Sequence, residues 1–133
     1  ASTSGLYNTN AFGSDDCTDE GLSQGAGGGS SDAVYAISPE VSGVYTITVE
    51  AEFDAVIYVV TNCDDVVSTC KGAADEPETL VISLETKQTY YIIVDGYSNT
   101  SDWAGTYSLD VSVPCLPDCG GKACGYSGFV LHC

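Results

Sequence analysis

The chain has 133 residues, seven of them cysteines. It contains 19 acidic side chains and only three lysines, which gives a formal net charge of −16. This length fits one domain with a core of ordinary size, and so few cations exclude nucleic acid as a partner, because phosphate binding requires clustered lysine and arginine. The longest apolar runs are far shorter than the roughly 20 residues that span a bilayer, so we expect no membrane insertion.

The cysteine content indicates the compartment in which the protein is expected. Disulfides persist in oxidising compartments, so this cysteine content predicts an extracellular protein that is secreted or attached to the cell surface. The chain opens with small polar residues, without the basic and apolar regions of a signal peptide, and we interpret Ala1 as the start of a processed chain.

Residues 1–31 are predicted to form an extended segment, because they are rich in Ser, Gly, Asn and Asp and contain too few apolar side chains to fold alone. The larger apolar anchors are Leu6, Tyr7 and Phe12, and Leu6 and Phe12 fall on the same face of an extended strand. We expect this strand to pair with an exposed sheet edge, its own or a neighbour's, and so to take part in self-assembly.

The same segment contains an acidic cluster made of Asp15, Asp16, Asp19 and Glu20. Carboxylate oxygens of this kind can converge on Ca²⁺ when a loop folds around the ion, although the spacing is not that of an EF-hand. A charge cluster is also commonly a solvated face, so calcium binding and simple solvation both stay open.

Residues 32–113 show the patterns of strands. The stretches GVYTITVEAEF (43–53) and GTYSLDVSV (105–113) alternate apolar and polar residues, which is typical of half-buried strands. AVIYVV (55–60) and TYYIIVDG (89–96) are apolar on both faces, which predicts central strands that are covered on each side. No window has a helical period. The fold prediction is therefore an all-β, antiparallel β-sandwich, jelly-roll-like and disulfide-stabilised, with almost no helix.

The cysteines near the middle of the chain predict one specific bridge. Cys63 and Cys70 flank the short stretch DDVVST, and we expect them to pair and to contribute about 2 to 3 kcal/mol. Cys17 is expected to bridge either to a tail cysteine or to the sandwich. Seven is an odd number, so one thiol is left over or joins another chain.

A loop and a tail complete the chain. Tyr97 and Trp103 bracket the loop SNTSD, where aromatic rings can stack on sugars or anchor a protein contact, although packing over the end of the sandwich is the commoner role. Residues 114–133 form a tail that holds Cys115, Cys119, Cys124 and Cys133, which we expect to form disulfides rather than a zinc site.

An enzyme is not expected. The single histidine, His132, is the penultimate residue, which leaves little to activate a serine or cysteine nucleophile. A pair of catalytic carboxylates stays conceivable, but no motif supports it.

Five ordered motifs carry a family resemblance. DAVYAISPEVSGVYTITVEAEFDAVIYVVTNC followed by KQTYYIIVDGYSNTSDWAGTYSLDVSV resembles the bacterial pre-peptidase C-terminal (PPC) domain over residues 12–113. The resemblance implies a secreted, non-catalytic β-sandwich that accompanies catalytic domains or surface proteins, some members of which carry calcium at an N-terminal acidic segment. CLPDCGGKACG is similar to cysteine-rich tails of myxobacterial secreted proteins but departs from them after Gly125, which leaves open whether the polypeptide continues past Cys133.

Two functions follow as expectations. In the first, the domain is a structural, self-assembling unit of an extracellular polymer or surface structure, whose partners are copies of itself. In the second, it is an accessory binding module that attaches a larger secreted hydrolase to a polysaccharide or protein surface. The extended N-terminal segment and the odd cysteine would link the copies in the first, and we expect the first because the chain carries no catalytic partner.

Overall fold

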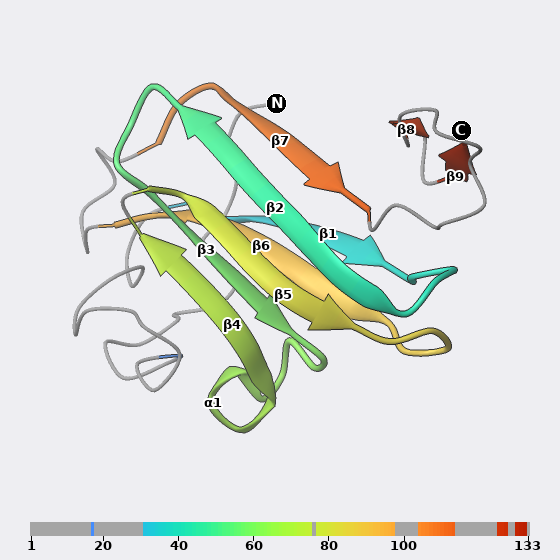
Figure 1. Ribbon diagram of the computed structural model, residues 1–133. Helices are drawn as coiled ribbons and strands as arrows, with labels where there is room; N and C mark the ends of the chain where they lie inside the picture. Colours follow the sequence, from blue (N-terminus) through green and yellow to red (C-terminus); the bar gives the residue numbers. More distant parts are fainter. Residues whose placement is uncertain are drawn as a thin grey trace.

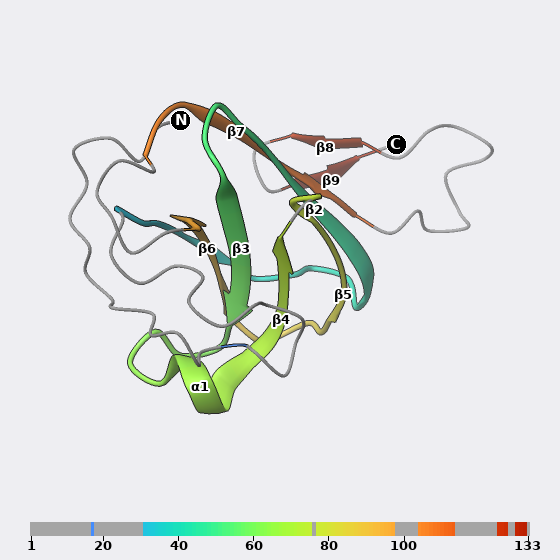
Figure 2. The same cartoon turned by 90° about the vertical axis from the view of Figure 1, so that its left-hand side faces the viewer.

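The computed structural model describes Cys17, residues 31–75, 77–97 and 104–113, and the backbone of residues 125–127 and 130–132. Between residues 31 and 113, the strands form two antiparallel sheets that pack face to face as a sandwich (Figure 1). Figure 2 separates the two layers, with β2 and β7 on one side and β3 and β6 on the other.

The strand order of each sheet follows from the backbone pairing. The four-stranded sheet has the order β1-β6-β3-β4, made of β1 (Ala33–Ile37), β6 (Tyr90–Gly96), β3 (Ala55–Val60) and β4 (Cys70–Asp75). The three-stranded sheet has the order β5-β2-β7, made of β5 (Thr79–Leu84), β2 (Gly43–Ala51) and β7 (Tyr107–Ser112). In the tail, β8 (Gly125–Ser127) pairs with β9 (Val130–His132).

This architecture confirms the predicted antiparallel β-sandwich. The described residues contain one helix, α1 (Val66–Thr69), which is four residues long, so the expectation of almost no helix also holds for them. Helix α1 begins after Asp65, whose carboxylate accepts a hydrogen bond of 3.2 Å from the backbone N–H of Ser68. Such an N-cap satisfies one of the backbone donors that a helix start leaves open.

The core between the sheets is built by alternation. In β2, the side chains of Tyr45, Ile47 and Val49 point inward and are at most 3% exposed, while the residues between them face outward. They pack against inward residues of β3 such as Ile57 and Val59, which are fully buried. The inward face that the alternation of GVYTITVEAEF predicts is therefore the observed one.

The two stretches that are apolar on both faces are the central strands of the four-stranded sheet. Every residue of β3 is buried, and Tyr91 is the only member of β6 that is half-buried rather than buried. Their outward side chains belong to a second group of buried residues, called here the outer cluster, which consists of Cys17, Val56, Tyr58, Val60, Val66, Ala73 and Ile93. The outer face of this sheet is therefore a second apolar layer that includes a residue of the N-terminal segment.

Candidate functional site

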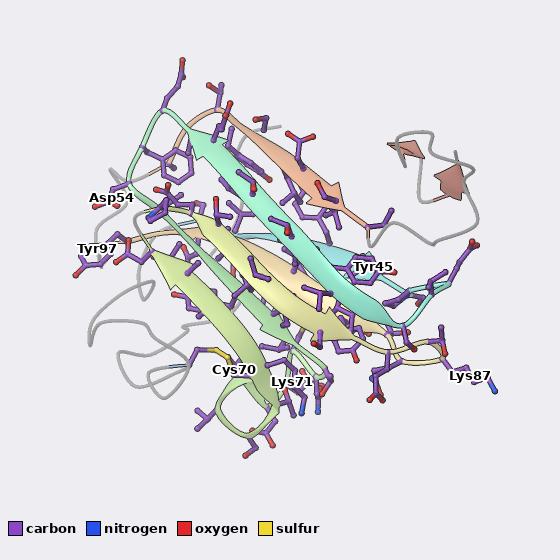
Figure 3. The ribbon with its side chains drawn as sticks, in the orientation of Figure 1. Tyr45, Asp54, Cys70, Lys71, Lys87 and Tyr97 are labelled. Carbon is purple, nitrogen blue, oxygen red and sulfur yellow. A yellow bond between two sulfur atoms is a disulfide. The ribbon has the colours of Figure 1, made fainter. Side chains whose placement is uncertain are left out.

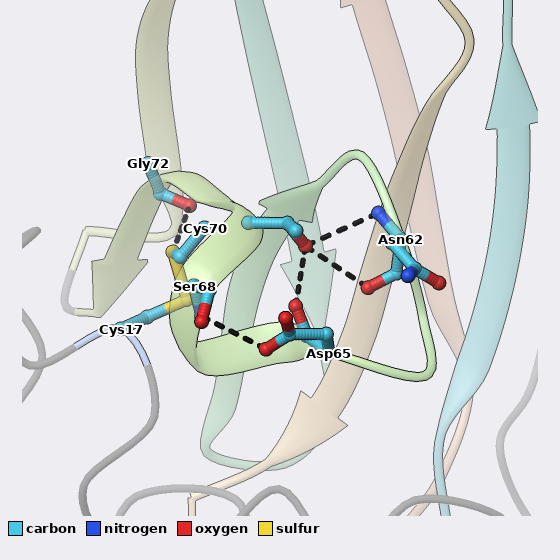
Figure 4. Close-up of a disulfide and its surroundings, with 7 residues drawn as sticks. Cys17, Asn62, Asp65, Ser68, Cys70 and Gly72 are labelled. Atoms are coloured by element: carbon cyan, nitrogen blue, oxygen red, sulfur yellow. Dashed lines mark hydrogen bonds between the residues drawn. A yellow bond between two sulfur atoms is a disulfide. The ribbon is translucent and has the colours of Figure 1, made fainter.

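The outer cluster contains the disulfide, and its pairing corrects the sequence-based expectation. Cys17 is bonded to Cys70, with their Cα atoms 5.6 Å apart, so the predicted Cys63–Cys70 bridge is wrong (Figure 4). Of the two alternatives for Cys17, the bridge to the sandwich is the one observed. Cys17 is only 4% exposed, and the bridge therefore ties the N-terminal segment to the outer face of the four-stranded sheet.

The physical reason lies in how residues 61–70 connect β3 to β4. The backbone N–H of Thr61 donates to the carbonyl of Thr69 at 3.2 Å, and the backbone N–H of Asn62 donates to the Thr69 hydroxyl at 3.1 Å. The Thr69 hydroxyl also lies 3.0 Å from the carbonyl oxygen of Asn62. Helix α1 takes up most of the intervening residues, so the connection is a capped helical turn rather than the simple hairpin that the spacing favoured.

Cys63, by contrast, keeps a free thiol. It is half-buried and packs against the outer cluster, as Cys70 does. Burial raises the pKa of the Cys63 thiol, and the negative charges of Asp64 and Asp32 raise it further. The thiol is therefore held in its protonated, unreactive form at neutral pH.

Acidic side chains gather at one end of the four-stranded sheet. Asp95 of β6 pairs with Val56, which pairs on its other side with Asp75, so the two aspartates flank one strand on the same face. Asp32 directly precedes Ala33, and continuing the β1–β6 register places it opposite Asp95. Asp32 is 4% exposed and Asp95 1% exposed, and the Asp95 carboxylate accepts a 2.7 Å hydrogen bond from the backbone N–H of Gly96.

These aspartates do not form a complete metal site by themselves. No group of three or more His, Cys, Asp or Glu side chains that could hold a metal ion occurs within the described ranges. The acidic residues proposed from the sequence, Asp15, Asp16, Asp19 and Glu20, lie outside those ranges.

Tyr97 lies at the same end of the sandwich as Asp54 (Figure 3). Its backbone N–H donates to the Asp54 carbonyl at 2.9 Å, and its half-buried side chain packs against the outer cluster. Tyr97 is thus part of the apolar layer, which agrees with the packing role rather than with an exposed stacking platform. Trp103 lies outside the described residues.

The outer face of the three-stranded sheet differs from the outer cluster because it is exposed. We call it the open face, and its uncharged members are Val44, Thr46, Thr48, Thr79, Val81, Ser83, Ser108 and Ser112. Its two acidic members are Glu50 and Asp110. Glu50 pairs with Ser108 and Asp110 pairs with Thr48, so the two carboxylates belong to successive outward cross-strand pairs at one end of the face. Val44 is 55% exposed and Val81 63% exposed.

Sequence reasoning placed part of the open face correctly but did not recognise it as a site. The alternation in GVYTITVEAEF and GTYSLDVSV put Thr46, Thr48 and Ser108 outward, as observed. The sequence holds one signal for the open face. These outward positions carry uncharged hydroxyl groups, whereas the chain as a whole has a net charge of −16. The exposed valine of β5 had no such signal, because an apolar residue in a strand is normally assigned inward.

The remaining predicted site residues belong to the two ends of the chain. Two groups of them lie outside the part of the chain whose side chains are described, namely the assembly residues Leu6, Tyr7 and Phe12 and the tail cysteines Cys115, Cys119, Cys124 and Cys133.

No helix in the described part of the chain has the length and apolar content that a membrane span requires. Comparisons with protein-family models, with curated proteins and with solved structures found no match.

Proposed function

We propose that this protein is a non-catalytic, extracellular β-sandwich of the kind that the PPC resemblance implies, and that it serves as a structural unit by associating with copies of itself. The observation that carries the proposal is the open face, a sheet surface with two exposed valines and few charges. The Cys17–Cys70 disulfide supports the extracellular part of the proposal, because such bonds persist in oxidising compartments.

Charge decides where two copies can meet. Each copy carries a net charge of −16, so most approaches bring like charges together and are unfavourable. The uncharged part of the open face lessens this repulsion, because Glu50 and Asp110 lie at one end of the face and the exposed Glu85 lies beyond the other, so the positions between them carry no charge. Burying Val44 and Val81 against a partner would add a favourable apolar contribution of up to about 1.5 to 3 kcal/mol for each side chain.

A second copy fits this face better than a polysaccharide does. Recognition of sugar rings relies on exposed aromatic side chains, and Tyr45 and Tyr107, the aromatic residues of β2 and β7, point into the core. The alternative function, an accessory module of a secreted hydrolase that binds polysaccharide or protein, would instead rest on Tyr97 and Trp103. The half-buried packing of Tyr97 gives that alternative little support.

Substitution of the open face tests the proposal. Val81→Asp should weaken self-association at least about tenfold in sedimentation velocity, because like charges brought together at an interface cost several kcal/mol. Val67→Asp is the matched control, since Val67 is 64% exposed on α1, away from the open face, and should leave association unchanged. Equal association of the two variants and the wild type would contradict the proposal.

The expected strand with Leu6, Tyr7 and Phe12 remains a second proposed contact. Its pairing with a sheet edge stays a prediction, because those residues are outside the described ones. Cys17 is bonded within its own chain, so any exchange between copies would involve the residues that precede it.

We also propose that calcium binds at the acidic end of the four-stranded sheet. The support is the burial of Asp32 and Asp95 at facing positions of neighbouring strands, which places side by side two carboxyl groups of the kind that Ca²⁺ binds. Carboxylates from the cluster Asp15, Asp16, Asp19 and Glu20 would have to complete the ligand set.

Thermal unfolding tests calcium binding. Excess Ca²⁺ should raise Tm above its value in EDTA, by about 4 to 8 °C for each kcal/mol of binding free energy gained by the folded state. Asp32→Asn should remove this rise, whereas Asp110→Asn, which alters an exposed acid on the open face, should retain it. The same Tm in calcium and in EDTA for the wild type would refute the site.

A further inference from the structure

The two lateral sides of the sandwich are covered to different degrees. On the side of β4 and β5, a Cβ atom at Gly72 would lie 3.1 Å from a methyl group of Leu80, so the absence of a side chain there lets the two sheets approach. The inward residues of β5 are at most 8% exposed. On the side of β1 and β7, Tyr35, Leu109 and Val111 pack against the core but stay half-buried. The side of β1 and β7 is therefore the less completely covered one.

Strand β1 forms the edge of the four-stranded sheet on that side. Among the strands that the structure describes, β1 pairs with β6 alone, at the end of the order β1-β6-β3-β4. In an antiparallel pair, every second residue directs its backbone N–H and C=O groups to the neighbouring strand, and the residues between direct theirs away from it. Another extended strand can therefore pair with the outward backbone groups of β1.

The composition of β1 leaves this edge without the usual protection. Natural sheet edges are commonly blocked by charged side chains or proline, and β1, with the sequence AVYAI, contains neither. By comparison, β4 contains Lys71 and Asp75, β7 contains Asp110, and the uncharged β5 lies on the covered side. The two outward side chains of β1, Val34 and Ala36, are both apolar and exposed. A second strand can thus approach β1 without meeting a charge of that strand, in a chain with a net charge of −16.

We propose that β1 of one copy pairs with β1 of a second copy, antiparallel and centred on Tyr35. The inference rests on the proposed self-association and names a second surface through which copies join. This register pairs all five residues of β1 and places Val34 of each copy opposite Ala36 of the other, so the exposed apolar side chains cover one another. Continuing the register places Asp32 opposite Ser38, so the acid that precedes β1 does not meet its own copy.

The β1 contact and the open face can act together. Strand β1 belongs to the four-stranded sheet, whereas the open face is the outer surface of the three-stranded sheet. One copy can therefore join one neighbour through β1 and another through the open face. A single symmetric contact closes a dimer, and two different contacts on each copy link more than two copies.

Sedimentation velocity of the full chain tests the inference in the Val81→Asp background, in which the open-face contact is weakened. We expect this parent to form dimers as its concentration rises, because β1 is unchanged. Adding Ala36→Glu should raise the dimer dissociation constant at least about tenfold, since it brings an unpaired carboxylate into an apolar cross-strand pair in both halves of the contact. Adding Val67→Glu instead is the matched control and should leave the constant unchanged, because Val67 is 64% exposed on α1.

A rescue variant tests the register. Adding Val34→Lys to the Ala36→Glu variant should recover most of the lost affinity, because each introduced lysine then lies opposite an introduced glutamate of the other copy. Pairing of β1 with any other strand, including the N-terminal segment of the chain, would not be restored in this way. A rescue variant that dimerises as weakly as the Ala36→Glu variant would therefore overturn the inference.

The remaining outcomes separate this inference from the open-face contact. A monomeric Val81→Asp parent overturns the β1 contact, while the open face stands if the wild type associates. Equal dimerisation with and without Ala36→Glu also overturns the β1 contact. Association that survives Val81→Asp undiminished and is lost on adding Ala36→Glu contradicts the open face and supports β1.

Discussion

Tyr35 and Tyr107 connect the two sheets through a hydrogen bond between their hydroxyl groups. Tyr35 lies in β1 of the four-stranded sheet and Tyr107 in β7 of the three-stranded sheet, so the bond crosses the core. Burial raises the pKa of the Tyr107 phenol, and the hydrogen bond with Tyr35 adds to this effect. The neutral phenol is therefore the form that the folded protein prefers.

This preference predicts a loss of stability at alkaline pH. A raised pKa in the folded state contributes stability below the unfolded pKa, about 10 for tyrosine, and that stability is lost as the pH rises above it. Urea unfolding should show a steeper decline of the unfolding free energy above about pH 10 in the wild type than in Tyr107→Phe. Parallel pH profiles for the two proteins would contradict the assignment.

The same pair can be examined at neutral pH. Tyr35→Phe and Tyr107→Phe should each cost about 0.5 to 1.5 kcal/mol, the usual net value of one hydrogen bond. The double variant should cost less than the sum, because either single change removes the same bond.

At the scale of elements, the pattern of apolar and polar residues was the main source of correct predictions about the strands. AVIYVV and TYYIIVDG were predicted to be covered on both faces, and β3 and β6 are the buried central strands of the four-stranded sheet. The alternating stretches became β2 and β7, which have one buried and one outward face. Period and burial are local properties of a strand, and they can therefore be read from a short stretch of sequence.

The connection between β3 and β4 was not predictable in the same way. The spacing of Cys63 and Cys70 favoured a local bridge, whereas the observed partner of Cys70 lies 53 positions away. Disulfide pairing depends on which cysteines the tertiary structure brings together, and spacing alone does not determine it. The outer cluster that receives Cys17 is itself a product of long-range packing between β3, β4 and β6.

The acidic end of the four-stranded sheet was also hidden in the sequence. Asp32, Asp75 and Asp95 are far apart along the chain, and only the strand order β1-β6-β3-β4 places them on one face at one end. The sequence instead drew attention to Asp15, Asp16, Asp19 and Glu20, which are neighbours in the chain. Sheet order is a long-range property that a local acidic motif does not reveal.

At the scale of the whole molecule, the two outer faces of the sandwich differ in exposure. The four-stranded sheet buries the outer face of its central strands in the outer cluster and its disulfide, and Val34 of the edge strand β1 is 41% exposed on that face. The three-stranded sheet leaves its outer face exposed, with hydroxyl groups and two valines. In a chain with a charge of −16, this difference is the ground on which we propose the open face as the place of contact between copies.

The salt dependence of self-association tests this claim most directly. Sedimentation velocity of the wild type at about 0.05 M and about 0.5 M salt compares repulsion that is weakly screened with repulsion that is strongly screened. Contact through the uncharged open face predicts stronger association at the higher salt concentration, because salt weakens the repulsion between copies and leaves the apolar contact intact. A monomer at both salt concentrations, or association that weakens as salt is added, would contradict the claim.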